Sequence, residues 1–68
     1  MPIEIVVNGE MRAASEGQTI RDLLQELNLD PSRVAVELNR RIVQQPNWSE
    51  TRLNAGAQVE IVQFVGGG

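Results

Sequence analysis

The chemistry that this chain can offer is concentrated in its last three residues, Gly66, Gly67 and Gly68. Glycine has no Cβ, so a run of three keeps the backbone thin and open to conformations that other residues rarely adopt. The one chemical group there is the α-carboxylate of Gly68, which is ionised at neutral pH. This pattern suits a protein whose own end is the reacting group. The alternative is a frayed terminus without a role, which is common in proteins.

Catalysis by side chains is restricted by the residue types that are absent. The 68 residues include no His, Cys, Lys or Tyr. The commonest general base, the thiol nucleophile, the Schiff-base amine and the soft metal ligands are therefore missing. A hydrolase that uses paired carboxylates stays formally open, but it needs a cleft that so short a chain has little material to build. We predict a protein that is not an enzyme and that binds no cofactor or metal.

Charge and hydropathy exclude several classes of partner. Nine acidic residues against six Arg give a formal net charge of −3, whereas binding to nucleic-acid phosphates needs a cationic face. No apolar run approaches the roughly 20 residues of a membrane span. The first residues, MPIEIVV, lack the charged and long apolar regions of a signal peptide. We expect a cytoplasmic protein that is a monomer when free and binds neither nucleic acid nor membrane.

The first half of the chain predicts a hairpin followed by a helix. Residues 3–7 are rich in β-branched side chains, and Asn8-Gly9 is a strong signal for a two-residue turn. The returning strand would cover residues 10–14, with Met11 and Ala13 pointing inward. Thr19 and Asp22 resemble a capping box at the start of a helix. One face of that helix is apolar, Asn28 suits its C-terminal end, and the apolar positions are Ile20, Leu23, Leu24 and Leu27.

The second half predicts a short meander that ends in a long strand. Alternation over residues 34–38 indicates a strand, and Asn39-Arg40 a turn into a short segment at 42–43. We expect Asn47 to cap a single helical turn through residues 49–51, with Trp48 and Leu53 holding this loop on the core. We expect the last strand to cover residues 58–65, and its apolar residues on both faces suit a central position beside the first strand. The order predicts an α+β, β-grasp domain over residues 1–65, a mixed sheet of four to five strands packed against one main helix, with a flexible glycine tail at 66–68.

This order, combined with a Gly-Gly end, is typical of ubiquitin-like proteins, and the chain resembles the bacterial sulfur carrier family of thiamine biosynthesis, the ThiS family. The resemblance runs over essentially the whole chain. It is carried by Asn8-Gly9, Gly17-Gln18-Thr19-Ile20, Leu23-Leu24, Val34-Ala35-Val36-Glu37-Leu38-Asn39, Ile42-Val43, Trp48, Gly56, Val59-Glu60-Ile61-Val62 and Gly67-Gly68. The chain departs from the family at Ala57, where relatives often carry an acidic residue, and in having a third glycine, Gly66.

The resemblance implies an activity in which this protein is a substrate of other enzymes. A partner adenylyltransferase, ubiquitin-activating-like and of the ThiF type, would consume ATP to adenylate the Gly68 carboxylate. A sulfur donor such as a cysteine desulfurase would then displace AMP and leave a thiocarboxylate on Gly68. A thiazole synthase of the ThiG type would take that sulfur into the thiazole ring of thiamine. Gly66 and Gly67 would thread the partner's active site.

Other residues and other functions stay open at this point. Val62 and Phe64 share one side of the last strand, and Phe64 belongs either to the core or to a partner interface. Arg41, in the basic pair Arg40-Arg41, either contacts an acidic groove of a partner or lies in a solvated turn. The carrier could serve another pathway, such as molybdopterin synthesis, cysteine synthesis or tRNA thiolation. The domain could also be a small protein-binding module with an inert tail.

Overall fold

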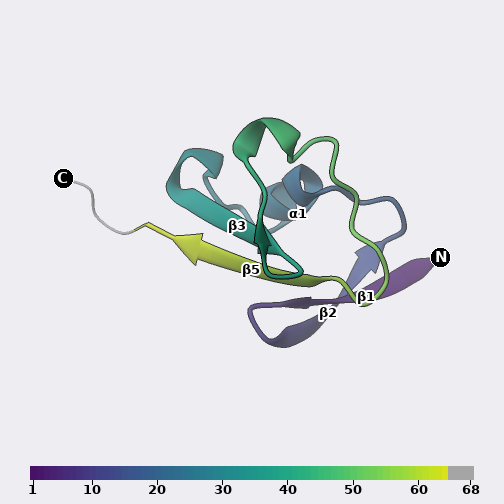
Figure 1. The fold of residues 1–68 in the computed structure, drawn as a ribbon. Coiled ribbons are helices and arrows are strands. Elements are labelled where there is room, and N and C mark those ends of the chain that lie inside the picture. The colour runs from purple at the N-terminus through teal and green to yellow at the C-terminus, as the bar shows by residue number, and fades with distance from the viewer. Residues whose placement is uncertain (65–68) are drawn as a thin grey trace.

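Five strands and one α-helix form two layers in the computed structural model, which describes residues 1–64 (Figure 1). Residue 65 and the glycines Gly66, Gly67 and Gly68 lie outside the described residues. Two single turns of 3-10 helix, η1 and η2, complete the element order, which is β1 Pro2–Val7, β2 Glu10–Ser15, α1 Ile20–Glu26, η1 Pro31–Arg33, β3 Val34–Leu38, β4 Arg41–Ile42, η2 Gln45–Asn47 and β5 Gln58–Gln63. The expected α+β class, a mixed sheet against one main helix, is confirmed.

The last strand occupies the centre of the sheet. The spatial order is β2-β1-β5-β3-β4, with β5 parallel to β1 and antiparallel to β3. Because β1 and β5 run in the same direction, the carboxyl end of β5 projects away from the N-terminus of the chain (Figure 1). The central position beside the first strand is therefore confirmed. The segment expected at 42–43 pairs one residue earlier, as β4.

The register of the first hairpin contradicts one prediction. Ala14 is buried and Arg12 half-buried, whereas Met11 is 68% exposed and Ala13 is also exposed. The two-residue turn pairs Val7 with Glu10, and this register places Arg12 opposite the buried Ile5. Directly opposite residues share a face of the sheet, so Met11 and Ala13 point away from the helix. The prediction followed the apolar character of Met11 and overlooked the constraint set by the turn.

Both ends of α1 are formed as the sequence indicates. The Thr19 hydroxyl accepts a hydrogen bond from the backbone N–H of Asp22, and the Asp22 carboxylate accepts one from the N–H of Thr19, both at 3.1 Å. At the other end Asn28 has a positive φ of 58°. The N–H groups of Asn28 and Leu29 donate to the carbonyls of Gln25 and Leu24, which is the Schellman arrangement. The predicted capping box and the predicted C-terminal residue are both confirmed.

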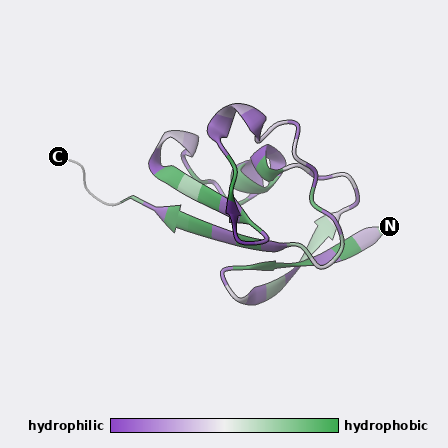
Figure 2. Cartoon of the chain, viewed as in Figure 1, coloured by the Kyte–Doolittle hydropathy of each residue, from purple (hydrophilic) through white to green (hydrophobic). Residues whose placement is uncertain are grey.

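The core lies between α1 and one face of the sheet, and Figure 2 shows the hydrophobic residues running along the strands. Trp48 and Leu53 are buried, as expected, and the Trp48 indole N–H donates to the Val43 carbonyl at 2.7 Å. The helical turn in this loop starts earlier than predicted, at Gln45, because Pro46 suits the first turn of a helix and Asn47 closes that turn. The buried core residues are Ile5, Ala14, Ile20, Leu23, Leu24, Val34, Val36, Trp48, Leu53, Ala57 and Val59.

Candidate functional site

The strand that leads toward the tail is held on both of its edges. On the β3 side, the backbone N–H of Phe64 donates to the Arg33 carbonyl at 2.7 Å, so the order of the sheet continues to the last described residue. Gly66, Gly67 and Gly68 follow outside the described residues. In the sequence, the candidate reactive end thus follows the central strand, separated from it by Phe64 and residue 65.

The Arg33 carbonyl is positioned by η1, which begins at a side-chain cap. One Asp30 carboxylate oxygen accepts hydrogen bonds from the Ser32 N–H at 2.9 Å and from the Ser32 hydroxyl at 2.7 Å. These hydrogen bonds stabilise the carboxylate, and with a smaller contribution from the charge of Arg33 they lower the pKa of Asp30 below its ordinary value. The cap thus supports the residue that holds Phe64.

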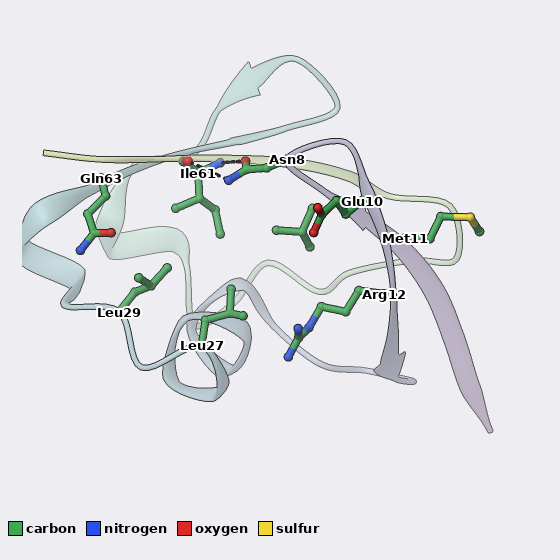
Figure 3. A pocket seen from close by; sticks show the side chains of 9 residues that line it. Asn8, Glu10, Met11, Arg12, Leu27, Leu29, Ile61 and Gln63 are labelled. Carbon is green, nitrogen blue, oxygen red and sulfur yellow. Dashed lines mark hydrogen bonds between the residues drawn. The ribbon is translucent and has the colours of Figure 1, made fainter.

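On the β1 side, β5 is held by a side chain. Pairing between β1 and β5 covers Val6 with Gln58 and Val7 with Val59, and Asn8 follows at a positive φ of 50°. The Asn8 side-chain oxygen accepts from the Ile61 N–H at 2.7 Å, and its NH₂ group donates to the Ile61 carbonyl at 3.2 Å (Figure 3). Sequence reasoning treated Asn8 only as a turn residue. The sequence signal for this contact was the Asn8 side-chain amide, which has both a donor and an acceptor and can therefore pair with the backbone of a neighbouring strand.

Val62 and Phe64 are exposed on the face of the sheet that points away from α1. Their exposed fractions are 58% and 57%, so Phe64 does not belong to the core of the described residues. The two faces of β5 differ in burial, because Val59 is buried and Ile61 half-buried toward α1 whereas Val62 lies in solvent. The apolar residues on the outer face of the sheet are thus a surface feature, and two of them, Val62 and Phe64, shortly precede the glycines in the sequence.

The register separates Arg41 from this pair. Arg41 lies opposite Leu38, and Leu38 lies opposite the buried Val59, so Arg41 falls on the helix side of the sheet edge. Ile42, which sequence reasoning did not single out, is 69% exposed on the same face as Val62. We define the outer apolar surface as Ala35, Ile42, Val62 and Phe64. Beside it Glu37 lies directly opposite Glu60, which adds negative charge to this face.

An open pocket of about 310 Å³ lies on the other face, between the first hairpin, the end of α1 and β5. Figure 3 shows Leu27 and Leu29 facing Ile61 across it, with Arg12 near its β2 side. The Arg12 guanidinium lies 3.7 Å from the Glu26 carboxylate, and its Nε–H is buried without a hydrogen-bond partner among residues 1–64. In the same range no group of three or more His, Cys, Asp or Glu is placed to hold a metal ion.

The family comparison reaches from the first strand through the tail. The ThiS family model matches residues 5–68, which includes all three terminal glycines. The chain belongs to the ThiS family. Its fold superimposes on a crystal structure of thiamine biosynthesis protein ThiS from Geobacter metallireducens with a TM-score of 0.83 at 29% identity, covering 97% of this chain and all of that one. The β-grasp, ubiquitin-like architecture is thereby confirmed.

Relatives with curated names fall into two length classes. The sulfur carrier protein ThiS of Escherichia coli is 27% identical over 66 residues, which is 97% of this chain and the whole of that protein. A thiazole synthase of Paramagnetospirillum magneticum is 42% identical over 66 residues, again 97% of this chain. The ThiS-family chain spans only 20% of that thiazole synthase, so it corresponds to one segment of the longer protein. Among the described residues of this chain, no helix is long and apolar enough to cross a membrane.

Proposed function

We propose that this protein is a sulfur carrier of thiamine biosynthesis and that the carboxyl group of Gly68 carries the sulfur. The observation that carries the proposal is the family match, which extends to residue 68 and so includes the tail. The fold supports it, because β5 directs the chain toward the tail from the centre of the sheet. The full-length similarity to the sulfur carrier of Escherichia coli supports it as well.

The chemistry requires an activating partner. A carboxylate is a poor acyl donor because its negative charge repels nucleophiles. Attack of the Gly68 carboxylate on the α-phosphorus of ATP would form an acyl adenylate and release pyrophosphate. The outer sulfur of a donor persulfide would then attack the acyl carbon, and AMP would leave with the bonding electron pair. A thiol would reduce the resulting acyl disulfide, which releases the Gly68 thiocarboxylate and leaves the donor cysteine in a disulfide with that thiol. Three glycines span at most about 10 Å, which sets how far such a tail reaches into a partner.

Because the sequence contains no His, Cys, Lys or Tyr, we infer that the partners supply the catalytic groups. We propose an adenylyltransferase of the ThiF type, a sulfur donor such as a cysteine desulfurase, and a thiazole synthase of the ThiG type. The thiazole synthase partner is supported by the thiazole synthases whose own chains contain a segment similar to this protein. The carrier would be a cytoplasmic monomer and a protein-borne substrate, while ATP is consumed by the partner.

The outer apolar surface is the candidate docking face for the adenylating partner. Val62 and Phe64 are exposed immediately before the tail, and exposed apolar groups near a reactive end favour a partner whose apolar residues cover them. The adjacent Glu37 and Glu60 favour basic residues at the rim of that partner surface. Arg41, which lies toward the other face, is not part of this docking face.

Intact-mass measurement tests the proposal. The protein is incubated with ATP, a cognate adenylating enzyme and a sulfur source, and we expect a mass gain equal to the replacement of one oxygen by sulfur. The matched control lacks Gly67 and Gly68 and should gain no mass. Absence of the gain in the intact protein, with full function retained after the deletion, would rule out a carrier. If the thiocarboxylate forms but thiazole synthase does not accept its sulfur, the protein would instead be a carrier of another sulfur-transfer pathway.

A further inference from the structure

The backbone pairing that supports β5 stops before β5 does. On the β1 side the last backbone pair joins Val7 to Val59, and the Asn8 N–H donates to the Val59 carbonyl at 2.8 Å. The chain then turns away through Asn8 and Gly9 into β2. The remainder of β5, residues 60–63, therefore extends beyond the end of its parallel neighbour.

The Asn8 side chain continues the ladder where the β1 backbone ends. Its oxygen and its NH₂ group engage the N–H and the carbonyl of Ile61, the two backbone groups that β1 would engage if it continued beside β5 (Figure 3). The two bonds link residues that are 53 positions apart in the sequence. Ile61 is half-buried against the core. The contact with Asn8 therefore fixes the position of the β5 backbone relative to β1 two residues before β5 ends.

We propose that Asn8 is a positioning residue for the reaction of the tail. This inference rests on the proposed function and identifies what holds the strand from which the tail departs. Ile61 is anchored to Asn8 on one edge, and Phe64 is anchored to Arg33 on the other. Loss of the Asn8 contact would leave the end of β5 held from one side, so that more conformational freedom must be lost when a partner binds the tail.

The second hairpin supplies a matched control. Asn39 also occupies a turn with positive φ, at 52°, and its side-chain oxygen accepts a hydrogen bond from the Gln58 N–H at 3.0 Å. It thus holds the same strand by the same kind of side chain, but at the opposite end of β5. Glycine adopts positive φ readily, so Asn8→Gly and Asn39→Gly each remove side-chain hydrogen bonds and retain the turn.

The experiment measures adenylation kinetics of the full-length carrier with its cognate adenylating enzyme. For Asn8→Gly we expect the KM for the carrier to rise about five- to tenfold, the effect of weakening one or two hydrogen bonds. The kcat should stay within about twofold, because a tail that has entered the active site has the same chemistry. Amide exchange at Ile61 should accelerate at least about tenfold. Asn39→Gly should leave KM, kcat and Ile61 exchange close to those of the unchanged protein.

A conservative variant separates positioning from folding. Asn8→Asp keeps the oxygen that accepts from Ile61 and loses the NH₂ group, so we expect a KM between those of the unchanged protein and Asn8→Gly. Equal KM values for Asn8→Gly and Asn39→Gly would overturn the inference while the carrier function stands. Faster Ile61 exchange without a change in KM would overturn it as well. An unchanged protein that is never adenylated would refute the proposed function itself.

Discussion

At the scale of single residues, this protein places two exposed apolar side chains shortly before, in sequence, the glycines proposed to carry the reacting group. Val62 and Phe64 lie on the strand that leads to the tail, and both are more than half exposed. Residue counting predicted the absence of a catalytic side chain, since His, Cys, Lys and Tyr do not occur in the sequence. It did not decide between core and surface for Phe64, because an apolar residue in a central strand suits both. The folded structure decided it, because Phe64 is more than half exposed there.

The docking role proposed for Phe64 predicts that Phe64→Ala loses affinity for the adenylating enzyme with little loss of stability. Phe64→Ala removes an aromatic ring that is 57% exposed, so the free energy of unfolding should change by no more than about 1 kcal/mol. The dissociation constant for the adenylating enzyme should rise at least about tenfold, as for an aromatic anchor in an interface centre. Titration calorimetry or interferometry checks the affinity, and urea unfolding checks the stability.

Met11→Ala is the matched control for Phe64→Ala. Met11 is 68% exposed on the same face of the sheet, but it lies on β2, at the opposite edge from β3 and β4. Its removal should leave both affinity and stability unchanged within error. A Phe64→Ala protein that unfolds at much lower urea concentration yet binds with unchanged affinity would show that Phe64 serves the fold.

At the scale of elements, local signals in the sequence predicted the ends of the helix and the positions of the turns. They did not predict which residues of β2 point inward, because the preceding turn sets the register of the whole strand. The two ends of α1 are set by contacts between residues close in sequence, which involve Thr19, Asp22 and Asn28. Contacts of this short range can be predicted from the sequence. The inward residues of β2 were predicted wrongly, since the two-residue turn at Asn8-Gly9 overrides the apolar character of Met11. Asn8 itself shows the same limit, because its contact with Ile61 depends on how two strands far apart in sequence end beside each other.

The cap of η1 predicts a component of stability that depends on pH. The pKa of Asp30 is lowered in the folded protein, so its carboxylate contributes stability above the ordinary carboxyl pKa of about 3.9, and this contribution is lost as pH falls through the folded pKa. Asp30→Asn removes the charge and retains an oxygen that accepts from Ser32. The variant should have a lower thermal midpoint at neutral pH, and the gap should close below about pH 4.

The comparison of the two proteins isolates Asp30, because the other carboxylates titrate in both. Thermal midpoints between neutral pH and acid, followed by circular dichroism, measure the gap. A gap that keeps the same size through the acid range would contradict the assigned role of the Asp30 charge.

At the scale of the whole molecule, the order of the strands determines where the tail begins. Placing β5 between β1 and β3 buries Val59 and leaves the following residues to project past β1. The sequence permitted this prediction, because a long apolar last strand after a helical crossover suits the centre of a mixed sheet. The outer apolar surface was not predictable in full. Ile42 joins Val62 through the pairing of β4 with β3, which no local pattern indicates.

The small core makes the whole domain sensitive to a single buried side chain. Leu53 is 2% exposed, and its N–H donates to the Gln18 carbonyl, so the loop after η2 closes over the core at this residue. Leu→Ala in a core costs about 2–5 kcal/mol, whereas a domain of this size is rarely more stable than about 3–5 kcal/mol. Leu53→Ala should therefore be substantially unfolded at 25 °C, with a collapsed urea midpoint and a matching loss of adenylation. Ile42→Ala, on a side chain 69% exposed, should stay within about 0.5 kcal/mol of the unchanged protein. A Leu53→Ala protein that unfolds within 1 kcal/mol of the unchanged domain, about the scale of a surface change, would show that the loop is not part of the cooperative core.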